Sequence, residues 1–297
     1  MKLGLPNLEN IPSLSLKEQT IINGRNNAYY FHYLTPGLSI KTMSNGQAIY
    51  EIEGGRFAVS DDSYLILNRD QPYIIDITSP TIVESFCLFF PDDWVNEVAY
   101  TVPRPDDLLL DDMLSPTPVS FFERLYPHDD LVSPHIRRLH ALVKSNHLTF
   151  GYLEEQLRFV LVAMLQQQFN IFRQIELLPA ARPATRLELY RRLYRARDYI
   201  HASLHCPLTI ADMAAVACLS PYHFLRAFKQ VFNQTPHHYL TQKRLERARF
   251  LLTHTDHPVT DICFQVGFES LGSFSTLFRR YSGCSPRDYR KTAIFEK

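Results

Sequence analysis

A pattern of five residues occurs twice near the end of the chain, and the second copy follows the first by 50 positions. A serine, two phenylalanines, a proline and a tyrosine recur: Ser220, Phe224, Phe228, Pro236 and Tyr239, then Ser270, Phe274, Phe278, Pro286 and Tyr289. A polar residue that can cap a helix, then aromatics at i+4 and i+8 and a later proline, is typical of a short amphipathic helix with a defined start and end. The chain is therefore predicted to contain one helical unit twice.

A second short helical pattern precedes each copy. Its apolar residues also recur, with a shift of 49: Ile210, Met213, Ala214 and Ala217, then Val259, Ile262, Cys263 and Val266. Two short helices joined by a tight turn form a helix-turn-helix unit. Such a unit serves mainly to present one exposed helix face to the major groove of DNA. The repeat therefore predicts two DNA-reading helices.

The charge distribution along the chain agrees with this prediction, although the net charge is zero. Residues 1–185 carry 14 Lys+Arg and 22 Asp+Glu, whereas residues 186–297 carry 17 and 9. A basic segment beside an acidic one favours a polyanion as the partner of the basic half. A chance imbalance of solvated faces is the alternative, but the coincidence with two helix-turn-helix patterns favours nucleic acid.

The region from about residue 28 to residue 90 is predicted to consist of short strands. Segments rich in β-branched and aromatic residues alternate with turn signals, of which Asn45-Gly46, Gly54-Gly55 and Ser79-Pro80 are the clearest. Strands at this spacing indicate a sandwich or a barrel. Its aromatic residues either line a pocket or, as is commoner, fill the core; they are Tyr50, Phe57, Tyr64, Tyr73 and Phe86.

Helices are predicted after this region. A short one lies near residues 94–98, and two longer ones span about 134–147 and 150–176. The last carries two apolar stripes, so it packs either on its own domain alone or also on a partner subunit. Residues 177–186 hold two prolines and three alanines and are interpreted as a linker. From about 187 onward the pattern is helical.

Four segments of the C-terminal region together resemble the DNA-binding domain of AraC-type bacterial transcription regulators. They are ARDYI (196–200), LTIADMAAVACLSPYHFLRAFKQVF (208–232), TPHHYLTQKRLERARFLL (235–252) and DICFQVGFES…FSTLFRRYSGCSPRDYR (261–290). The resemblance implies seven helices with two helix-turn-helix units joined rigidly by the middle helix, each recognition helix entering one of two successive major grooves. The strand-rich half resembles the cupin-like domain of many members of this family, on the basis of its architecture and the segment CLFFPDDW.

The expected fold is therefore α+β. A cupin-like barrel or jelly-roll domain with dimerisation helices occupies residues 1–176, a linker 177–186, and an all-α DNA-binding domain 187–297. The expected function is that of a sequence-specific regulator, most often an activator, which binds double-stranded DNA as a homodimer, responds to a small-molecule effector and contacts RNA polymerase. No signal peptide or membrane-spanning run is apparent, so a cytoplasmic location is expected.

On the first recognition helix, the pattern places Phe224, Ala227, Phe228 and Val231 in the core. Arg226 is the leading candidate for base reading, because its planar fork can grip guanine O6 and N7 together. Tyr222 and Leu225 match other contact positions of the family. The phosphate contacts expected across both units are Ser220, Lys229, Arg244, Ser270, Arg279 and Arg280.

The second recognition helix departs from the family. Phe274, Leu277, Phe278 and Tyr281 are expected to face inward, and the candidate base contacts are Leu271, Gly272, Ser273 and Thr276. These short side chains cannot reach far into a groove, so this unit is expected to position the protein more than to read sequence. The turns differ too, because Cys218 stands where the second unit has Gly267. A left-handed Cys218 would carry strain of about 1 kcal/mol or more.

Two other classes of function are open. One is a sensor controlled by a protein partner, without a small ligand. The other is a cupin-type metalloenzyme fused to the DNA-binding domain, which the histidine pattern does not favour: His32, His128, His135, His140 and His147 include no pair one residue apart. Nucleophile and phosphate-binding motifs are also missing, so neither catalytic residues, a metal nor a cofactor is expected.

Overall fold

The computed structural model describes residues 21–35, 37–52, 55–101, 119–145, 150–178 and 182–295. Apart from the short segment Gly54–Ala58, the chain divides into two compact units, Met1–Leu187 and Glu188–Lys297. Part of the predicted Gly54-Gly55 turn lies outside the described residues. None of the helices in the described ranges is long and apolar enough to cross a bilayer.

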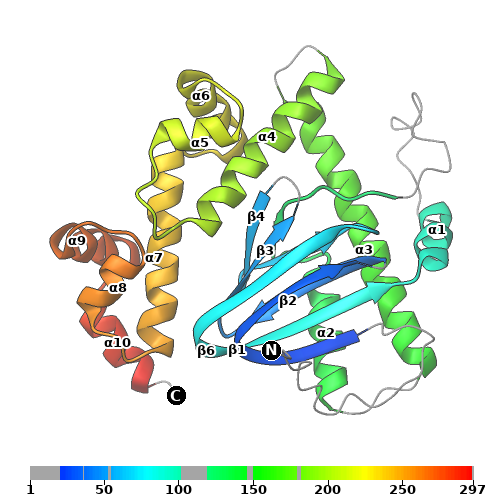
Figure 1. The fold of residues 1–297 in the computed structure, drawn as a ribbon, viewed down its shortest axis with the longest axis horizontal. Coiled ribbons are helices and arrows are strands. Elements are labelled where there is room, and N and C mark those ends of the chain that lie inside the picture. Colours follow the sequence, from blue (N-terminus) through cyan, green and yellow to red (C-terminus); the bar gives the residue numbers. More distant parts are fainter. Residues whose placement is uncertain are drawn as a thin grey trace. The chain divides into compact units, whose positions relative to one another are not determined.

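The first unit is built on a seven-stranded antiparallel sheet that curls into a nearly closed barrel (Figure 1). Its strands are β1 (Ile21–Leu34), β2 (Leu38–Ser44), β3 (Gln47–Ile52), β4 (Gly55–Ser60), β5 (Ser63–Leu67), β6 (Pro72–Phe90) and β7 (Leu125–Pro127). The sheet order is β4-β3-β6-β2-β5-β7, with β1 on the other side of β6. The predicted strand-rich barrel is confirmed.

The long central strand β6 differs from the prediction, which placed a break at Ser79-Pro80. The strand continues through both residues and pairs with β1 on either side of them, Thr78 with Ala28 and Val83 with Asn26. Proline has no N–H to donate to a ladder, and an irregularity in the register is a place where it is tolerated. The predicted turn at Asn45-Gly46 is confirmed, with φ of +62° and +155°.

In the part of the chain that the structure describes, three helices accompany the barrel, at the places that the sequence predicts. They are α1 (Asp92–Thr101), α2 (Ser133–Lys144) and α3 (Phe150–Glu176). Most residues of both apolar stripes of α3 are buried within the chain, including Leu157 and Met164 of one and Leu161 and Leu165 of the other. This burial favours the reading in which α3 packs within its own chain.

The aromatic residues that were candidates for a pocket are all buried, but in different surroundings. The Tyr64 ring stacks on Tyr126 with centroids 5.3 Å apart, and its hydroxyl donates to Asp129 over 3.1 Å. Phe86 packs against His140 of α2. Tyr50 instead packs against Tyr73, with centroids 5.6 Å apart. Core packing therefore accounts for Tyr64 and Phe86.

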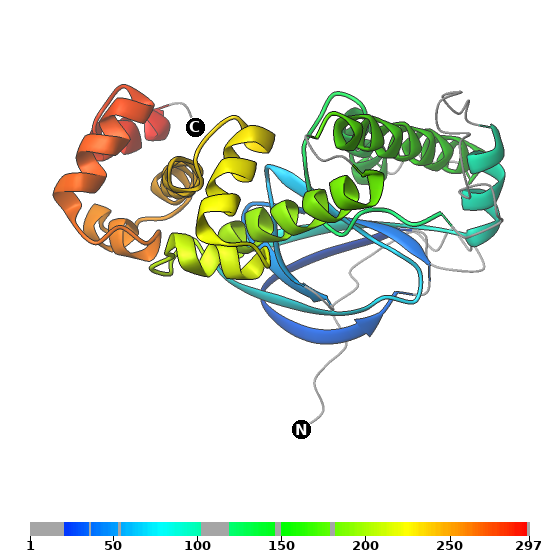
Figure 2. The ribbon, with the colours of Figure 1, turned by 90° about the horizontal axis from the view of Figure 1, so that it is seen from above.

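The second unit consists of seven helices in the described residues. They are α4 (Pro183–Ala202), α5 (Ile210–Val216), α6 (Pro221–Phe232), α7 (Pro236–His254), α8 (Val259–Gln265), α9 (Leu271–Ser282) and α10 (Pro286–Phe295). Helix α4 begins at Pro183 rather than at the predicted residue 187, since proline is well suited to the first helical turn. In Figure 1 and, end-on, in Figure 2, α7 runs between the α5–α6 pair and the α8–α9 pair.

Each helix pair closes its own apolar core. The first core contains Phe224 and Phe228 of α6 with Tyr239 of α7, and the second contains Phe274 and Phe278 of α9 with the C-terminal half of α7. The middle helix thus contributes residues to both cores, Leu240 to the first and Leu245 to the second. Because one continuous helix serves both cores, α7 fixes the two pairs in one body.

A candidate nucleic-acid interface on two repeated helices

The first exposed helix, α6, has clear start and stop signals. Ser220 caps it by accepting a hydrogen bond from the His223 N–H over 3.4 Å, and Pro221 occupies the first turn. It ends where Asn233 adopts a left-handed conformation with φ of +57°, which asparagine tolerates better than most residues. Helix α5 before it is fixed by a capping box between Thr209 and Asp212. These local contacts fix where α5 begins and where α6 begins and ends.

The outward face of α6 carries the residues that the sequence predicts there. Tyr222 is 77% exposed and Leu225 38% exposed, and Arg226 and Lys229 are exposed as well. Phe224, Ala227 and Phe228 are buried and Val231 is half-buried. The predicted orientation of this helix is confirmed, and the structure brings Tyr222, Leu225 and Arg226 onto its free surface.

The second exposed helix, α9, repeats this arrangement with shorter side chains. Ser270 caps it by accepting from the Ser273 N–H over 3.2 Å. Leu271, Gly272, Ser273 and Thr276 are all exposed. The hydroxyl of Thr276 donates to the carbonyl of Gly272 over 2.9 Å, and that of Ser270 to Ser273 Oγ over 2.9 Å. Their donor hydrogens are therefore engaged within the helix.

The inward face of α9 departs from prediction at one residue. Phe274 and Phe278 are buried, but Tyr281 is 39% exposed. Its hydroxyl donates to the carboxylate of Glu246 on α7 over 3.2 Å. A tyrosine has a polar tip that needs a partner, so this ring lies at the rim, where the hydroxyl reaches Glu246.

Four cations on the two exposed helices are free to act on a ligand. Arg226 and Lys229 on α6 and Arg279 and Arg280 on α9 are exposed, and none of these four side chains makes an ion pair or hydrogen bond with any residue in the described ranges. Exposed guanidinium and ammonium groups without an internal carboxylate neutralise phosphates at little desolvation cost. They supply the positive charge of this surface.

Two exposed or half-buried cations of the middle helix have partners within the unit. Lys243 pairs with Glu246 over 2.8 Å, and the Arg249 Nε donates to the Tyr289 hydroxyl over 2.9 Å. The hydrogen bond to Tyr289 raises the pKa of Arg249. These groups stabilise the packing of α7 on its neighbours.

Arg244 in particular was predicted to contact phosphate, and in the structure two of its donors are engaged within the unit. Its Nε donates to the carbonyl of Leu204 over 2.9 Å and its Nη2 to the carbonyl of Cys206 over 2.7 Å. Burial lowers the pKa of this guanidinium. Two donors of the fork thus hold the loop between α4 and α5, so Arg244 positions the first pair against the middle helix.

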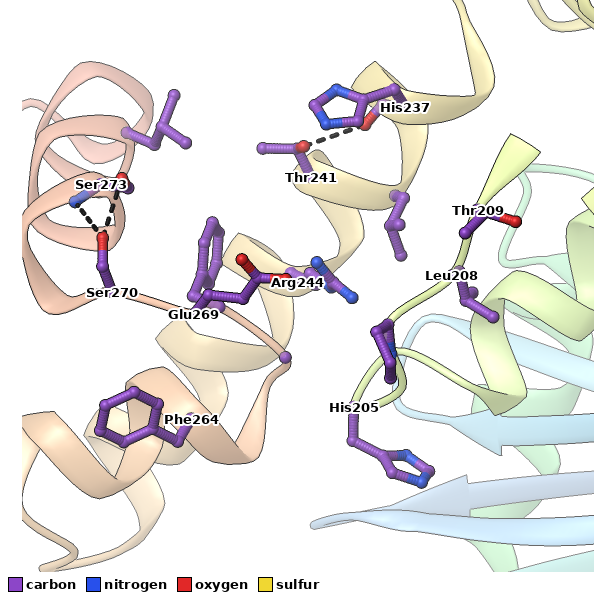
Figure 3. Close-up of a pocket in the computed structure, with 15 residues that line it drawn as sticks. His205, Leu208, Thr209, His237, Thr241, Arg244, Phe264, Glu269, Ser270 and Ser273 are labelled. Carbon is purple, nitrogen blue, oxygen red and sulfur yellow. Dashed lines mark hydrogen bonds between the residues drawn. The ribbon is translucent and has the colours of Figure 1, made fainter. Parts of the chain in front are cut away.

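A cavity of about 820 Å³ lies between the two helix pairs, beside Arg244 (Figure 3). Helix α7 supplies His237, Thr241 and Arg244, and Thr209 and Ser270 border it from the two sides. His237 and Thr241 were not among the predicted site residues. Their signal is a pair of polar residues at i and i+4 on the helix that joins the two units, so they share the face that lies between them.

Comparison with known proteins supports the C-terminal assignment. Residues 213–292 match the family model of a helix-turn-helix domain. The transcriptional activator RhaS of Klebsiella pneumoniae (strain 342) is 48% identical over 80 residues, which are 27% of this chain and 29% of that protein. The probable regulator LumQ of Photobacterium leiognathi is 36% identical over 93 residues, 31% and 38% of the two chains. The match thus spans about a third of these curated relatives.

Solved structures match the same region. The C-terminal domain of AraT, a response regulator from Geobacillus stearothermophilus, is 35% identical and covers 35% of this chain and 87% of that one, with a TM-score of 0.34. An AraC-type regulator from Chromobacterium violaceum is 28% identical and covers 38% and 96%, with a TM-score of 0.33. The repeated helix pairs and the matches to the family model and to RhaS agree, and the chain carries, in its C-terminal region, the helix-turn-helix domain of AraC-type transcriptional regulators.

Proposed function

We propose that the chain binds double-stranded DNA sequence-specifically, with α6 and α9 entering two successive major grooves of one duplex face. The observation that carries this proposal is the repetition of one capped, outward-facing helix on each side of α7, with unpaired cations on both copies. Grooves on one face are about 34 Å apart centre to centre, which two rigidly linked helices can span.

The two helices have different roles in this proposal, since α6 reads bases and α9 mainly positions the protein. Arg226 reads a base, with Tyr222 and Leu225 beside it, and Leu225 packs on a thymine methyl. The shorter residues of α9, which are Leu271, Gly272, Ser273 and Thr276, lie against the second groove and contribute little discrimination. Phosphates are held by Ser220, Lys229, Ser270, Arg279 and Arg280, with the N–H groups at the two helix starts.

Selection from a random DNA pool, followed by binding measurements on three variants, tests this division. We expect Arg226→Ala to weaken the selected site by about 10- to 100-fold and to relax its sequence preference. Thr276→Ala changes affinity by less than about twofold, since that hydroxyl already bonds to Gly272. Arg195→Ala, which removes an exposed arginine of α4, is the charge-matched control. Equal selective losses from the first two variants would overturn the ranking.

We further propose that the chain activates transcription in response to a small molecule bound in the barrel, acting as a homodimer that contacts RNA polymerase. The support for activation is that the matched RhaS protein is an activator. Transcription in vitro from a promoter carrying the selected site, with purified polymerase, tests the direction of control. Sedimentation of the protein with and without DNA tests the dimer. An effect that requires a second protein and no small molecule would favour control by a protein partner.

A further inference from the structure

A lysine lies inside the barrel of the first unit. Lys41 is at the middle of β2, is 1% exposed, and pairs across the sheet with Cys87 of β6 and Leu65 of β5. Side chains alternate between the two faces of a strand, so Lys41 points away from the face on which its neighbour Thr42 pairs with Phe86. Phe86 packs on α2, hence the Lys41 side chain lies on the interior face.

The surroundings of the Lys41 ammonium are aromatic. The nitrogen lies 3.8 Å from the ring centroid of Phe89 and 5.3 Å from that of Tyr73. Tyr73 packs on Tyr50, with ring centroids 5.6 Å apart. Within the described ranges, no carboxylate forms an ion pair with Lys41. The ring faces attract the cation but do not replace a counter-ion.

A second polar group on the same face is also unpartnered. Ser39, two residues before Lys41 on β2, is fully buried, and its hydroxyl has no hydrogen-bond partner among the described residues. Residues i and i+2 of a strand point to the same side, so this hydroxyl and the ammonium lie on one interior face. A buried polar group without a partner is costly, and a buried unpaired charge more so.

The electrostatics of the site agree with this geometry. Burial lowers the pKa of Lys41 to about 8, which means that the folded protein holds the charged form at a cost. An anion beside the nitrogen would remove that cost. One ammonium balances one negative charge, and a planar carboxylate can accept from an ammonium and a hydroxyl at once. The rings of Phe89, Tyr73 and Tyr50 offer apolar contact to the rest of such a molecule.

We propose that the barrel interior binds a monocarboxylate, with Lys41 as its counter-ion and the Ser39 hydroxyl as a second donor. This inference rests on the proposed control of the regulator by a small molecule and gives the chemical class of that molecule. It assigns Phe89 and Tyr73 to the wall of the site. It assigns Tyr64 and Phe86 to packing, in keeping with their contacts to Asp129 and His140.

Calorimetric titration of the full chain with hexanoate, decanoate, benzoate and phenylacetate tests the proposal, with the matching primary amides as uncharged controls. We expect at least one acid to bind and its amide to bind at least tenfold more weakly. Lys41→Met gives an unbranched side chain one atom shorter and without the charge, and should weaken binding of that acid at least tenfold. Ser39→Ala should weaken it about threefold. Lys144→Met, which removes an exposed lysine paired with Glu84, should leave it unchanged.

Failure of all four acids to bind the wild-type chain at 10 mM would overturn the proposal, as would equal binding of acid and amide. Binding that Lys41→Met leaves intact would do the same. If the Lys41→Met protein does not fold, the proposal is tested by the Ser39→Ala variant and by the comparison of each acid with its amide. Calorimetry needs no DNA, so this result is independent of the test of DNA binding. A chain that binds the acid but selects no duplex would refute DNA regulation alone.

Discussion

Cys218 and Gly267 occupy the same place in the two helix-turn-helix turns, and both have a left-handed backbone, with φ of +50° and +94°. The N–H groups that follow them make the same contact, from Leu219 to the carbonyl of Ala214 over 3.0 Å and from Phe268 to that of Cys263 over 3.1 Å. The turn therefore has one geometry in both units. Only the second uses the residue that adopts it without steric strain.

Replacing Cys218 by glycine should stabilise the chain. A residue with a Cβ in the left-handed region carries strain of about 1 kcal/mol, and glycine removes it at some cost in unfolded-chain entropy. We expect Cys218→Gly to raise the free energy of unfolding of the C-terminal unit by about 0.5–1 kcal/mol, measured by denaturant titration. Cys218→Ala retains the Cβ and should show no such gain. A gain of equal size in both variants would attribute the effect to the thiol instead.

The same turn in the second unit should not tolerate a side chain. A Cβ on Gly267 would lie 2.3 Å from the Leu204 carbonyl oxygen and 2.8 Å from Nη2 of Arg244. Gly283 also has a positive φ, of +80°, but a Cβ there meets no described atom within 4 Å. Gly267→Ala should therefore cost about 3 kcal/mol or more, and Gly283→Ala only about 1 kcal/mol. If the two variants lost similar stability in thermal melts, the atoms around residue 267 would have moved to accommodate the added Cβ at little energetic cost.

Neutralising Arg244 should lower the stability of the C-terminal unit, whereas neutralising Arg279 should change DNA binding and not stability. Arg244→Gln removes hydrogen bonds to the carbonyls of Leu204 and Cys206, so the unfolding free energy should fall by about 2 kcal/mol. Arg279 is exposed and unpaired in the described structure, so Arg279→Gln should leave stability unchanged. It should instead lower the slope of log K against log salt by about 1. A lower slope in a stable Arg244→Gln protein would return Arg244 to the phosphate contacts.

The sequence predicts the repeated unit well because its signals are local. A serine cap, two buried phenylalanines and a following proline specify α6 and α9 without knowledge of the rest of the chain. Hydrogen-bond partners that are distant in the sequence cannot be predicted in this way. The carbonyls that accept from Arg244 lie about 40 positions earlier, at Leu204 and Cys206, and no local pattern marks them. The sequence therefore suggests that Arg244 is available to phosphate, whereas in the folded unit its side chain donates to two backbone carbonyls.

The barrel shows the same limit. Alternating β-branched and aromatic segments predict its strands, yet the pattern cannot show which face of β2 is interior, because residues of both faces are buried. Lys41 is thus indistinguishable in sequence from a solvated lysine at the edge of a strand. Only its pairing with Cys87 and Leu65 places it inside the barrel.

The stability of the first unit should depend on pH through Lys41. Its pKa falls from 10.5 to about 8 on folding, since burial disfavours the ammonium, whereas Cys87 beside it has a raised pKa. Below pH 8 lysine is charged in both states and the folded state carries the full penalty, about 3 kcal/mol. As the pH rises from 8 to 10.5 the folded protein loses the proton first, so the penalty declines.

The unfolding free energy of the wild-type chain relative to Lys41→Met should therefore rise across pH 8 to 10.5. At pH 7 the variant should be the more stable of the two, because a thioether carries no charge to bury. Taking the difference between the two proteins cancels the tyrosines and the other lysines, which titrate in both. Denaturant titrations at pH 7, 8.5 and 10 measure it. A difference that stays constant with pH would mean that the ammonium is solvated or already paired, and the case for an anion beside it would fall.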